Sequence, residues 1–110
     1  MKLRLALKPQ ADRDINNQFE YIAKDNLEAA IRFYEAAFSA FEVLQTNPNI
    51  GPARAFENAE LDNVRIWLVK GFDKYLIFYR ATDELVEILR VLHTSRDIDR
   101  ILSSEESTTE

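Results

Sequence analysis

Three runs in the second half of the chain are rich in β-branched, aromatic and other apolar residues. They cover residues 64–69, 75–80 and 85–93. Such runs are typical of half-buried strands. The polar gaps between them are of about four or five residues, a length that favours hairpins. We therefore predict an antiparallel meander of three strands, with the upstream part of the chain covering one face of it.

The first residues alternate between leucine and charged or small residues. Leu3, Leu5 and Leu7 recur with a period of two, which predicts a first strand. Pro9 suits the first turn of a helix, because its missing N–H group would have no helical partner there. Helical spacing of apolar residues then predicts a first helix over residues 10–23. The residues that mark its apolar side are Ala11, Ile15, Phe19 and Ile22.

A second helix is predicted from about residue 27 to residue 45. Asp25 and Glu28 resemble a capping box at its start, and Asn47-Pro48 ends it. Its aromatic residues are most simply interpreted as core residues. Phe33 and Trp67 nevertheless lie off the best apolar stripes of their elements, which leaves open an exposed apolar groove that binds a partner. The stripe predicted to face the core consists of Leu27, Ile31, Tyr34, Phe38, Phe41 and Leu44.

The predicted element order is β-α-α-β-β-β, which indicates an α+β domain over residues 1–102. A helical hairpin would pack on one face of a small, mostly antiparallel sheet. The first strand has to lie beside one of the later strands, because a helical hairpin separates it from them. Residues 49–62 are long enough for a functional loop. Residues 103–110 contain no apolar side chain, so we expect a disordered acidic tail.

Composition narrows the class of protein. The chain has 110 residues, 46% hydrophobic and 30% charged, which suits one globular domain. No apolar run approaches the roughly 20 residues that span a bilayer, and no signal peptide is recognisable, so we expect a cytoplasmic protein. The chain contains no cysteine, and its net charge of -5 argues against direct nucleic-acid binding.

Two arginines occur on predicted strands among large apolar residues. Arg80 follows Leu76 and Phe78 at alternate positions, and Arg90 lies among similar residues of the next strand. We predict that the two arginines meet across the sheet with a carboxylate such as Asp97 or Glu87. Two interpretations stay open, namely a structural ion-pair network and a face that binds an anion or a partner protein.

His93 is followed by Arg96 and Asp97, a combination capable of acid–base chemistry. The alternative is a hydrogen-bonded histidine that anchors the turn after the last strand. This is the one histidine of the chain, and nothing else has the spacing of a metal site. The two glycines do not form a phosphate-binding loop. We therefore expect neither a metal nor a cofactor.

The runs VRIWLVKGF, YLIFYR and VEILRVLHTSRDI together resemble the ParE branch of the RelE/ParE toxin superfamily, also called plasmid-stabilisation toxins. The resemblance covers about residues 3–102. It implies the toxin of a type II toxin–antitoxin pair, neutralised in a hetero-oligomer by a ParD-like antitoxin whose disordered part folds on binding. The matching positions are Arg65, Tyr75, Tyr79, Arg80, Arg90, His93, Arg96 and Asp97.

The resemblance implies one of two targets. ParE-like toxins poison DNA gyrase, whereas RelE-like relatives cleave mRNA on the ribosome and need an acid, a base and cations. This chain is acidic, has Leu76 where the RelE pattern often has arginine, and offers only His93, Arg90 and Arg96 as nuclease residues. We expect a gyrase inhibitor; a nuclease, or a non-toxic relative that only binds the antitoxin, is the alternative. The partner-binding candidates are Arg65, Trp67, Arg80, Arg90, His93, Arg96 and Asp97.

Overall fold

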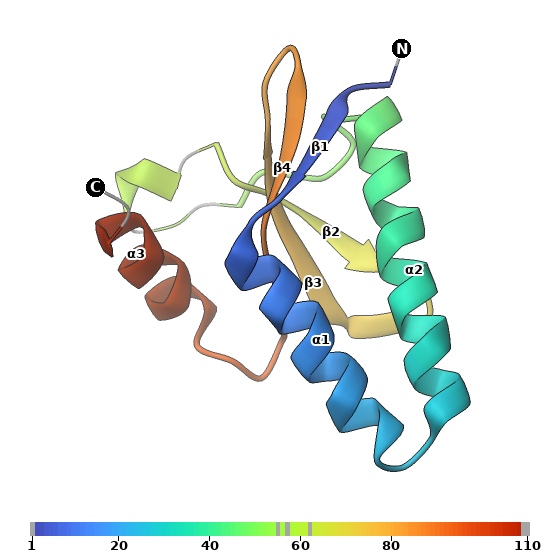
Figure 1. The fold of residues 1–110 in the computed structure, drawn as a ribbon. Coiled ribbons are helices and arrows are strands. Elements are labelled where there is room, and N and C mark those ends of the chain that lie inside the picture. The colour runs from blue at the N-terminus through green and yellow to red at the C-terminus, as the bar shows by residue number, and fades with distance from the viewer. Residues whose placement is uncertain (1, 55, 57, 62, 109–110) are drawn as a thin grey trace.

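The computed structural model describes residues 2–54, 56, 58–61 and 63–108, and the predicted order of strands and helices is confirmed. Two elements were not predicted, a short 3-10 helix, η1, and a C-terminal helix, α3 (Figure 1). No helix in the described part of the chain is long and apolar enough to cross a membrane. The elements are β1 (Arg4–Leu7), α1 (Pro9–Ala23), α2 (Leu27–Thr46), η1 (Ala59–Leu61), β2 (Arg65–Val69), β3 (Phe72–Ala81), β4 (Leu85–His93) and α3 (Ile98–Thr108).

The four strands form one sheet in the order β1-β4-β3-β2. β1 pairs in parallel with β4, with Arg4 opposite Leu85, and the other neighbours are antiparallel. The predicted place of the first strand, beside a later strand, is confirmed. β1 and β2 are thus the two edges of the sheet.

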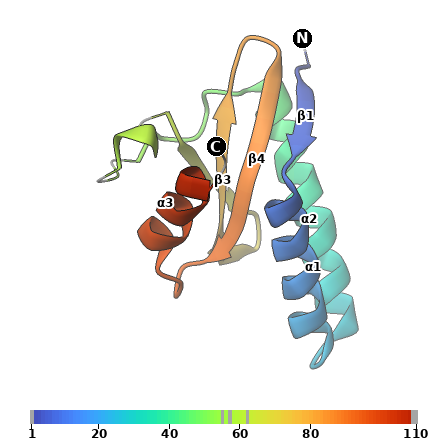
Figure 2. The same cartoon turned by 60° about the vertical axis from the view of Figure 1, so that its left-hand side comes forward.

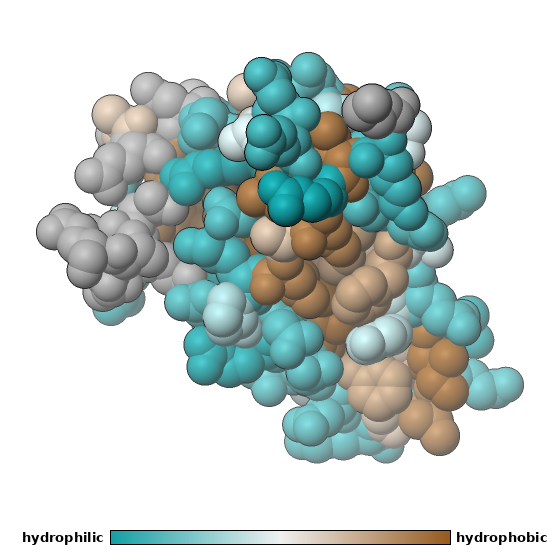
Figure 3. Space-filling view, turned by 45° about the horizontal axis from the view of Figure 1, so that its top comes forward, coloured by the Kyte–Doolittle hydropathy of each residue, from teal (hydrophilic) through white to brown (hydrophobic). Residues whose placement is uncertain are grey.

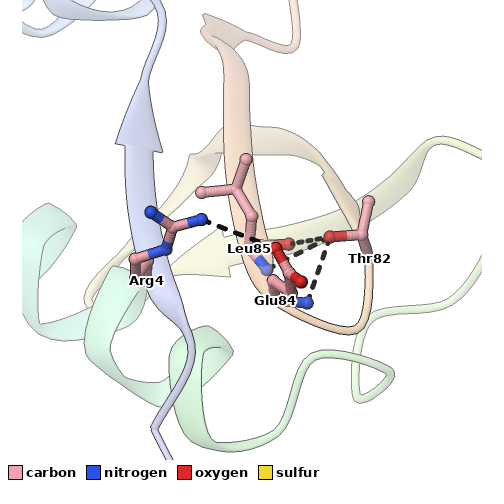
Figure 4. A network of polar contacts seen from close by, with 4 residues as sticks. All are labelled: Arg4, Thr82, Glu84 and Leu85. Carbon is pink, nitrogen blue, oxygen red and sulfur yellow. Dashed lines mark hydrogen bonds and ion pairs between the residues drawn. The ribbon is translucent and has the colours of Figure 1, made fainter.

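In the turn between β3 and β4, the Thr82 hydroxyl accepts hydrogen bonds from the backbone N–H groups of Glu84 and Leu85 (Figure 4).

Helices cover both faces of the sheet. The α1–α2 hairpin lies on one face as predicted, whereas α3, which was not predicted, lies on the other (Figure 2). The second face has its own small core, because residues from the loop before β2 and from α3 pack on it. That core contains Leu61, Val64, Phe78, Leu89, Leu92, Ile98 and Leu102.

The side of α2 that packs on the sheet is only partly the predicted one, because Phe41 and Leu44 are buried as expected whereas Leu27, Ile31 and Tyr34 are exposed. Phe33 is fully buried, with its ring edge-on to Phe72 at 5.3 Å and to Tyr75 at 5.0 Å between centroids. Its interpretation as a core aromatic is confirmed, and a place for it in an exposed groove is wrong. Alanine side chains on the same side let the helix backbone approach the sheet closely. The buried residues of α2 are Ala30, Phe33, Ala37, Ala40, Phe41, Leu44 and Gln45.

Two boundaries also differ from the predictions. The N-cap of α2 is Asn26, whose side chain accepts from the N–H of Ala29 at 3.0 Å, rather than Asp25. At the C-terminus, α3 continues to Thr108, so the predicted division at residue 102 falls inside a helix. Ile98 and Leu102, four residues apart, attach the helix to the second core. The division of the chain into a domain and a tail stays a prediction.

Candidate functional site

Two of the singled-out residues hold the loop that follows α2. The buried hydroxyl of Tyr79 donates to the carbonyl of Pro48 at 2.8 Å and accepts from the N–H of Gly51 at 3.0 Å. Arg65 donates to the carbonyls of Gly51 at 2.7 Å and Asn49 at 3.3 Å. Burial raises the pKa of Tyr79, and the Gly51 hydrogen bond and the Arg65 charge oppose this rise. The described contacts of Arg65 are therefore with the protein's own loop.

Arg90 forms a nearly buried ion pair with Asp14 of α1. Its Nε and Nη2 atoms donate to the two carboxylate oxygens of Asp14 at 2.7 and 2.8 Å. Asp14 also accepts from the backbone N–H of Val91 at 3.0 Å. β1 ends at Leu7, so the rest of this edge of β4 has no neighbouring strand. There the Asp14 carboxylate of α1 accepts the backbone hydrogen bond that a strand would otherwise accept. The arginine is thus used to attach α1 to the sheet.

A bulge in β4 explains why Val86 and Ile88 do not share a face with Leu92, although they alternate with it in the sequence; the face shared by Leu76 and Phe78 of β3 is as predicted. Phe78 pairs with Arg90, but the next residue, Tyr79, pairs with Ile88, so Leu89 is an extra residue on β4. The extra residue reverses the alternation of side chains along the strand. Val86 and Ile88 accordingly pack under the hairpin, whereas Leu89 and Leu92 pack in the second core.

The predicted meeting of Arg80 and Arg90 is also wrong. The Nε atom of Arg80 donates to the side-chain oxygen of Asn63 at 2.9 Å, and in the sheet Arg80 lies opposite Glu87. Asp97, the other predicted partner, caps α3, where its carboxylate accepts from the N–H of Arg100 at 3.4 Å. The arginines therefore bind different segments, and the ion-pair interpretation holds for Arg90, with Asp14 as its carboxylate.

His93 and Arg96 line one open cavity of about 390 Å³. His93 lies opposite Tyr75 in the sheet, and their rings contact edge to face at 5.0 Å between centroids. The Tyr75 hydroxyl donates to the side chain of Gln18 at 3.0 Å, and burial raises the pKa of Tyr75. The complete lining is Asn17, Gln18, Tyr21, Tyr75, His93, Ser95 and Arg96.

The hydrogen bonds of His93 in this cavity favour one tautomer of its imidazole ring. Its Nδ1 atom accepts from the backbone N–H of Ser95 at 3.0 Å and lies 2.8 Å from the Ser95 hydroxyl. An accepting Nδ1 places the ring proton on Nε2. The predicted anchoring of the turn is confirmed, with Ser95 rather than Asp97 as the partner. The α1 residues of the cavity were missed, because nothing local in the sequence relates Gln18 to Tyr75.

The cavity offers one cation, hydrogen-bond donors and aromatic rings. Arg96 is exposed and has no ion pair within the described residues. Tyr21 presents an exposed ring beside it. Such groups suit an anionic or aromatic part of a ligand. Nowhere among the described residues do three histidine, aspartate or glutamate side chains gather as metal ligands would.

Trp67 lies elsewhere, in a groove between α2 and the β2–β3 hairpin. The groove has a volume of about 650 Å³. Val43 and Leu68, both exposed, contribute to its apolar lining. The prediction of a groove at Trp67 is thus confirmed, whereas Phe33, the other residue expected in that groove, is buried in the core.

The fold is that of known toxin–antitoxin proteins. A chain of the chromosomal ParDE system from P. aeruginosa matches with a TM-score of 0.67 and 19% identity, covering 84% of this chain and 96% of that chain. A chain of the RelBE2 toxin–antitoxin complex from Mycobacterium tuberculosis matches with a TM-score of 0.55 and 26% sequence identity, and the match covers 84% of this chain and 99% of that chain. A chain of the YoeB dimer from Staphylococcus aureus matches with a TM-score of 0.55 and 12% sequence identity, and the match covers 82% of this chain and 94% of that chain.

Comparison of the sequence itself leads to the same group. No curated protein matches the chain significantly. The family model of the ParE toxin of type II toxin–antitoxin systems, parDE, matches residues 5–98, which include all the residues singled out above. The chain therefore belongs to the ParE toxin family of type II toxin–antitoxin systems.

Proposed function

We propose that the protein inhibits DNA gyrase by direct contact, in the cytoplasm, and is neutralised by a ParD-like antitoxin. The family match over residues 5–98 supports a toxin of the ParE type. The solved structures it resembles include the ParDE system of P. aeruginosa and the RelBE2 toxin–antitoxin complex. Both similarities support an antitoxin partner.

The observation that carries the choice of a contact mechanism is the ion pair between Asp14 and Arg90. Cleavage of RNA needs cations near the developing negative charge of the phosphate. Arg90, one of three residues available for that purpose in the sequence, donates two hydrogen bonds to one carboxylate, and its side chain is largely buried. The net charge of -5 would in addition oppose binding of a polyanion.

A RelE-like ribosome-dependent nuclease is the second candidate, because His93 and Arg96 share one cavity. The Nε2–H group of His93 would act as the general acid, and Arg96 would bind the phosphate. A nuclease would need both His93 and Arg96 for cleavage of the RNA.

Two assays with the purified full chain separate the candidates. We expect inhibition of gyrase supercoiling of relaxed plasmid, reversed by the co-purified antitoxin, and no cleavage of mRNA on translating ribosomes. Intact supercoiling together with mRNA cleavage that His93→Ala abolishes would establish the nuclease instead. Binding of the antitoxin without effect in either assay would identify a non-toxic relative.

A further inference from the structure

The cavity around His93 presents a positive charge and no negative charge. The chain contains 19 aspartates and glutamates and has a net charge of -5, yet none of them is among the described residues that line this cavity. Asp97, next to Arg96 in the sequence, caps α3 instead. Arg96 is exposed and has no ion pair within the described residues. In a mainly acidic protein, a place of this kind attracts an anion.

The hydrogen bonds inside the cavity leave mainly donor groups for a ligand. The side-chain oxygen of Gln18 accepts from the hydroxyl of Tyr75 at 3.0 Å, so the amide N–H groups of Gln18 remain for a ligand. The Nδ1 atom of His93 accepts from the N–H of Ser95, which leaves the Nε2–H group. The guanidinium of Arg96 also only donates. A ligand that fits these groups offers acceptor oxygens.

The walls of the cavity are held in place by the protein itself. The ring of Tyr75 contacts Phe33 and His93 edge to face, each at 5.0 Å between centroids. The backbone N–H of Arg96 donates to the carbonyl of His93 at 3.0 Å, which closes the turn that carries Arg96. Walls that are already ordered lower the entropic cost of binding. The cavity is therefore prepared for a small, rigid ligand.

Tyr21 adds an aromatic surface to this cavity. It is 67% exposed, the largest exposed fraction among the exposed large apolar side chains of the described residues. Most of its ring is thus not covered by the protein. A ligand ring stacked on Tyr21 would cover it, in a geometry that aromatic pairs favour.

The character of the cavity narrows the class of ligand. Figure 3 shows a band of hydrophobic side chains bordered by hydrophilic ones on one face of the molecule. The cavity is of a different kind, because in about 390 Å³ it combines tyrosine rings with amide, imidazole and guanidinium groups. That volume is at the lower end of small-molecule sites. A nucleobase carries donors as well as acceptors, whereas the oxygens of a carboxylate only accept. Donor groups therefore favour an aromatic acid over a nucleotide.

We propose that this cavity binds a small aromatic carboxylate. The ring of the ligand stacks on Tyr21, and its carboxylate accepts from the guanidinium of Arg96 and the Nε2–H group of His93. The bound acid neutralises the charge of Arg96 and competes with any contact that Arg96 makes to a target protein. The proposal does not depend on gyrase being that target, because the isolated protein binds the ligand.

Four small molecules test the proposal with the full-length protein. Benzoate has the ring and the carboxylate, benzamide has the ring without the charge, acetate has the charge without the ring, and adenosine monophosphate represents nucleotides. Binding is followed by the backbone amide signals in ¹H–¹⁵N NMR spectra. We expect benzoate to shift the signals of residues 17–21 and 93–96 saturably, and to bind about tenfold more tightly than each of the other three molecules.

Substitutions of exposed residues locate the binding site. Arg96→Gln should weaken binding of benzoate about fivefold, because the ion pair is lost. Arg13→Gln is the matched control, since it removes the same charge from an exposed position of α1 outside the cavity, and it should leave binding unchanged. Tyr21→Ala should weaken binding about threefold through the loss of stacking. The same NMR spectra verify that each variant is folded.

Four outcomes would overturn the proposal. These are the absence of saturable shifts at the cavity, binding of acetate or benzamide as tight as that of benzoate, equal effects of Arg96→Gln and Arg13→Gln, and tighter binding of adenosine monophosphate than of benzoate. The last outcome would identify a nucleotide site and favour the nuclease candidate. No outcome depends on inhibition of gyrase, so a failure of the proposed function leaves this test valid.

Discussion

Asp14 and Arg90 lie 76 positions apart in the sequence and form a two-point ion pair in which each side chain is largely buried. The pair joins α1 to β4 just beyond the end of β1. Asp14 also satisfies the N–H of Val91. One carboxylate therefore binds both the side chain and the backbone of the same strand.

We predict that Asp14→Asn destabilises the protein by about 3–5 kcal/mol, because the largely buried charge of Arg90 would lose the negative charge of Asp14. Chemical denaturation measures the change in the free energy of unfolding. The double variant Asp14→Leu/Arg90→Met should recover a large part of the loss, since it removes both buried charges.

The exposed pair of Arg4 and Glu84, 3.6 Å apart, is the control for that experiment (Figure 4). Water screens these side chains, so Glu84→Ala should change the free energy of unfolding by less than about 1 kcal/mol. A loss for Asp14→Asn no larger than this would contradict the structural role of the buried pair.

Thr82 should matter more than its exposed neighbours in the turn between β3 and β4. Its hydroxyl accepts from two backbone N–H groups, of Glu84 at 3.2 Å and Leu85 at 3.1 Å. We expect Thr82→Ala to cost about 1 kcal/mol, whereas Thr82→Ser keeps the hydroxyl and most of the stability. Thermal unfolding of the two variants measures the difference, and equal losses would show that the hydroxyl is dispensable.

Gly51 should tolerate no side chain. A Cβ atom there would lie 2.7 Å from the hydroxyl of Tyr79 and would meet the backbone carbonyl of Ile66, which cannot move freely. We predict that Gly51→Ala destabilises the protein by about 1–3 kcal/mol, as overpacking commonly does. Equilibrium denaturation is the measurement. An unchanged midpoint of denaturation for Gly51→Ala would mean that residues 47–54 can move to make room for the methyl group without loss of stability.

Stability at high pH should depend on Tyr79. Its pKa in the folded protein is raised above the ordinary value of 10.0, so the folded state holds the proton more tightly than the unfolded chain. The stabilisation is complete below pH about 10 and is lost as the pH rises through the raised pKa. The advantage of the natural protein over Tyr79→Phe should thus shrink in alkaline solution. Denaturation of both at pH values from 8 to about 11 tests this expectation.

For function, we predict that Arg96→Glu weakens inhibition of gyrase about tenfold or more without affecting stability, because Arg96 is exposed and has no ion pair within the described residues. Arg13→Glu, an equal change of charge at an exposed position of α1, is the control. If both substitutions weaken inhibition equally, overall charge rather than the His93 cavity is responsible.

Several features of the fold could be predicted because their signals are local. The alternation of Leu3, Leu5 and Leu7 defines β1, Pro9 begins α1, and Asn47-Pro48 ends α2. The length of the hairpin between β1 and the later strands excludes a tight turn, so the place of β1 beside one of those strands also follows. The motif around His93 indicated the family.

The sequence by itself determined the element order and the family, because periodicity, turn residues and the motif lie within short stretches. The tertiary structure alone decided which of two apolar stripes of α2 is buried, since the choice depends on how closely the alanines let the helix approach the sheet. It also decided the partners of Arg80 and Arg90. One extra residue at Leu89 reverses the alternation along β4, and the carboxylate that reaches Arg90 comes from a helix 76 positions away.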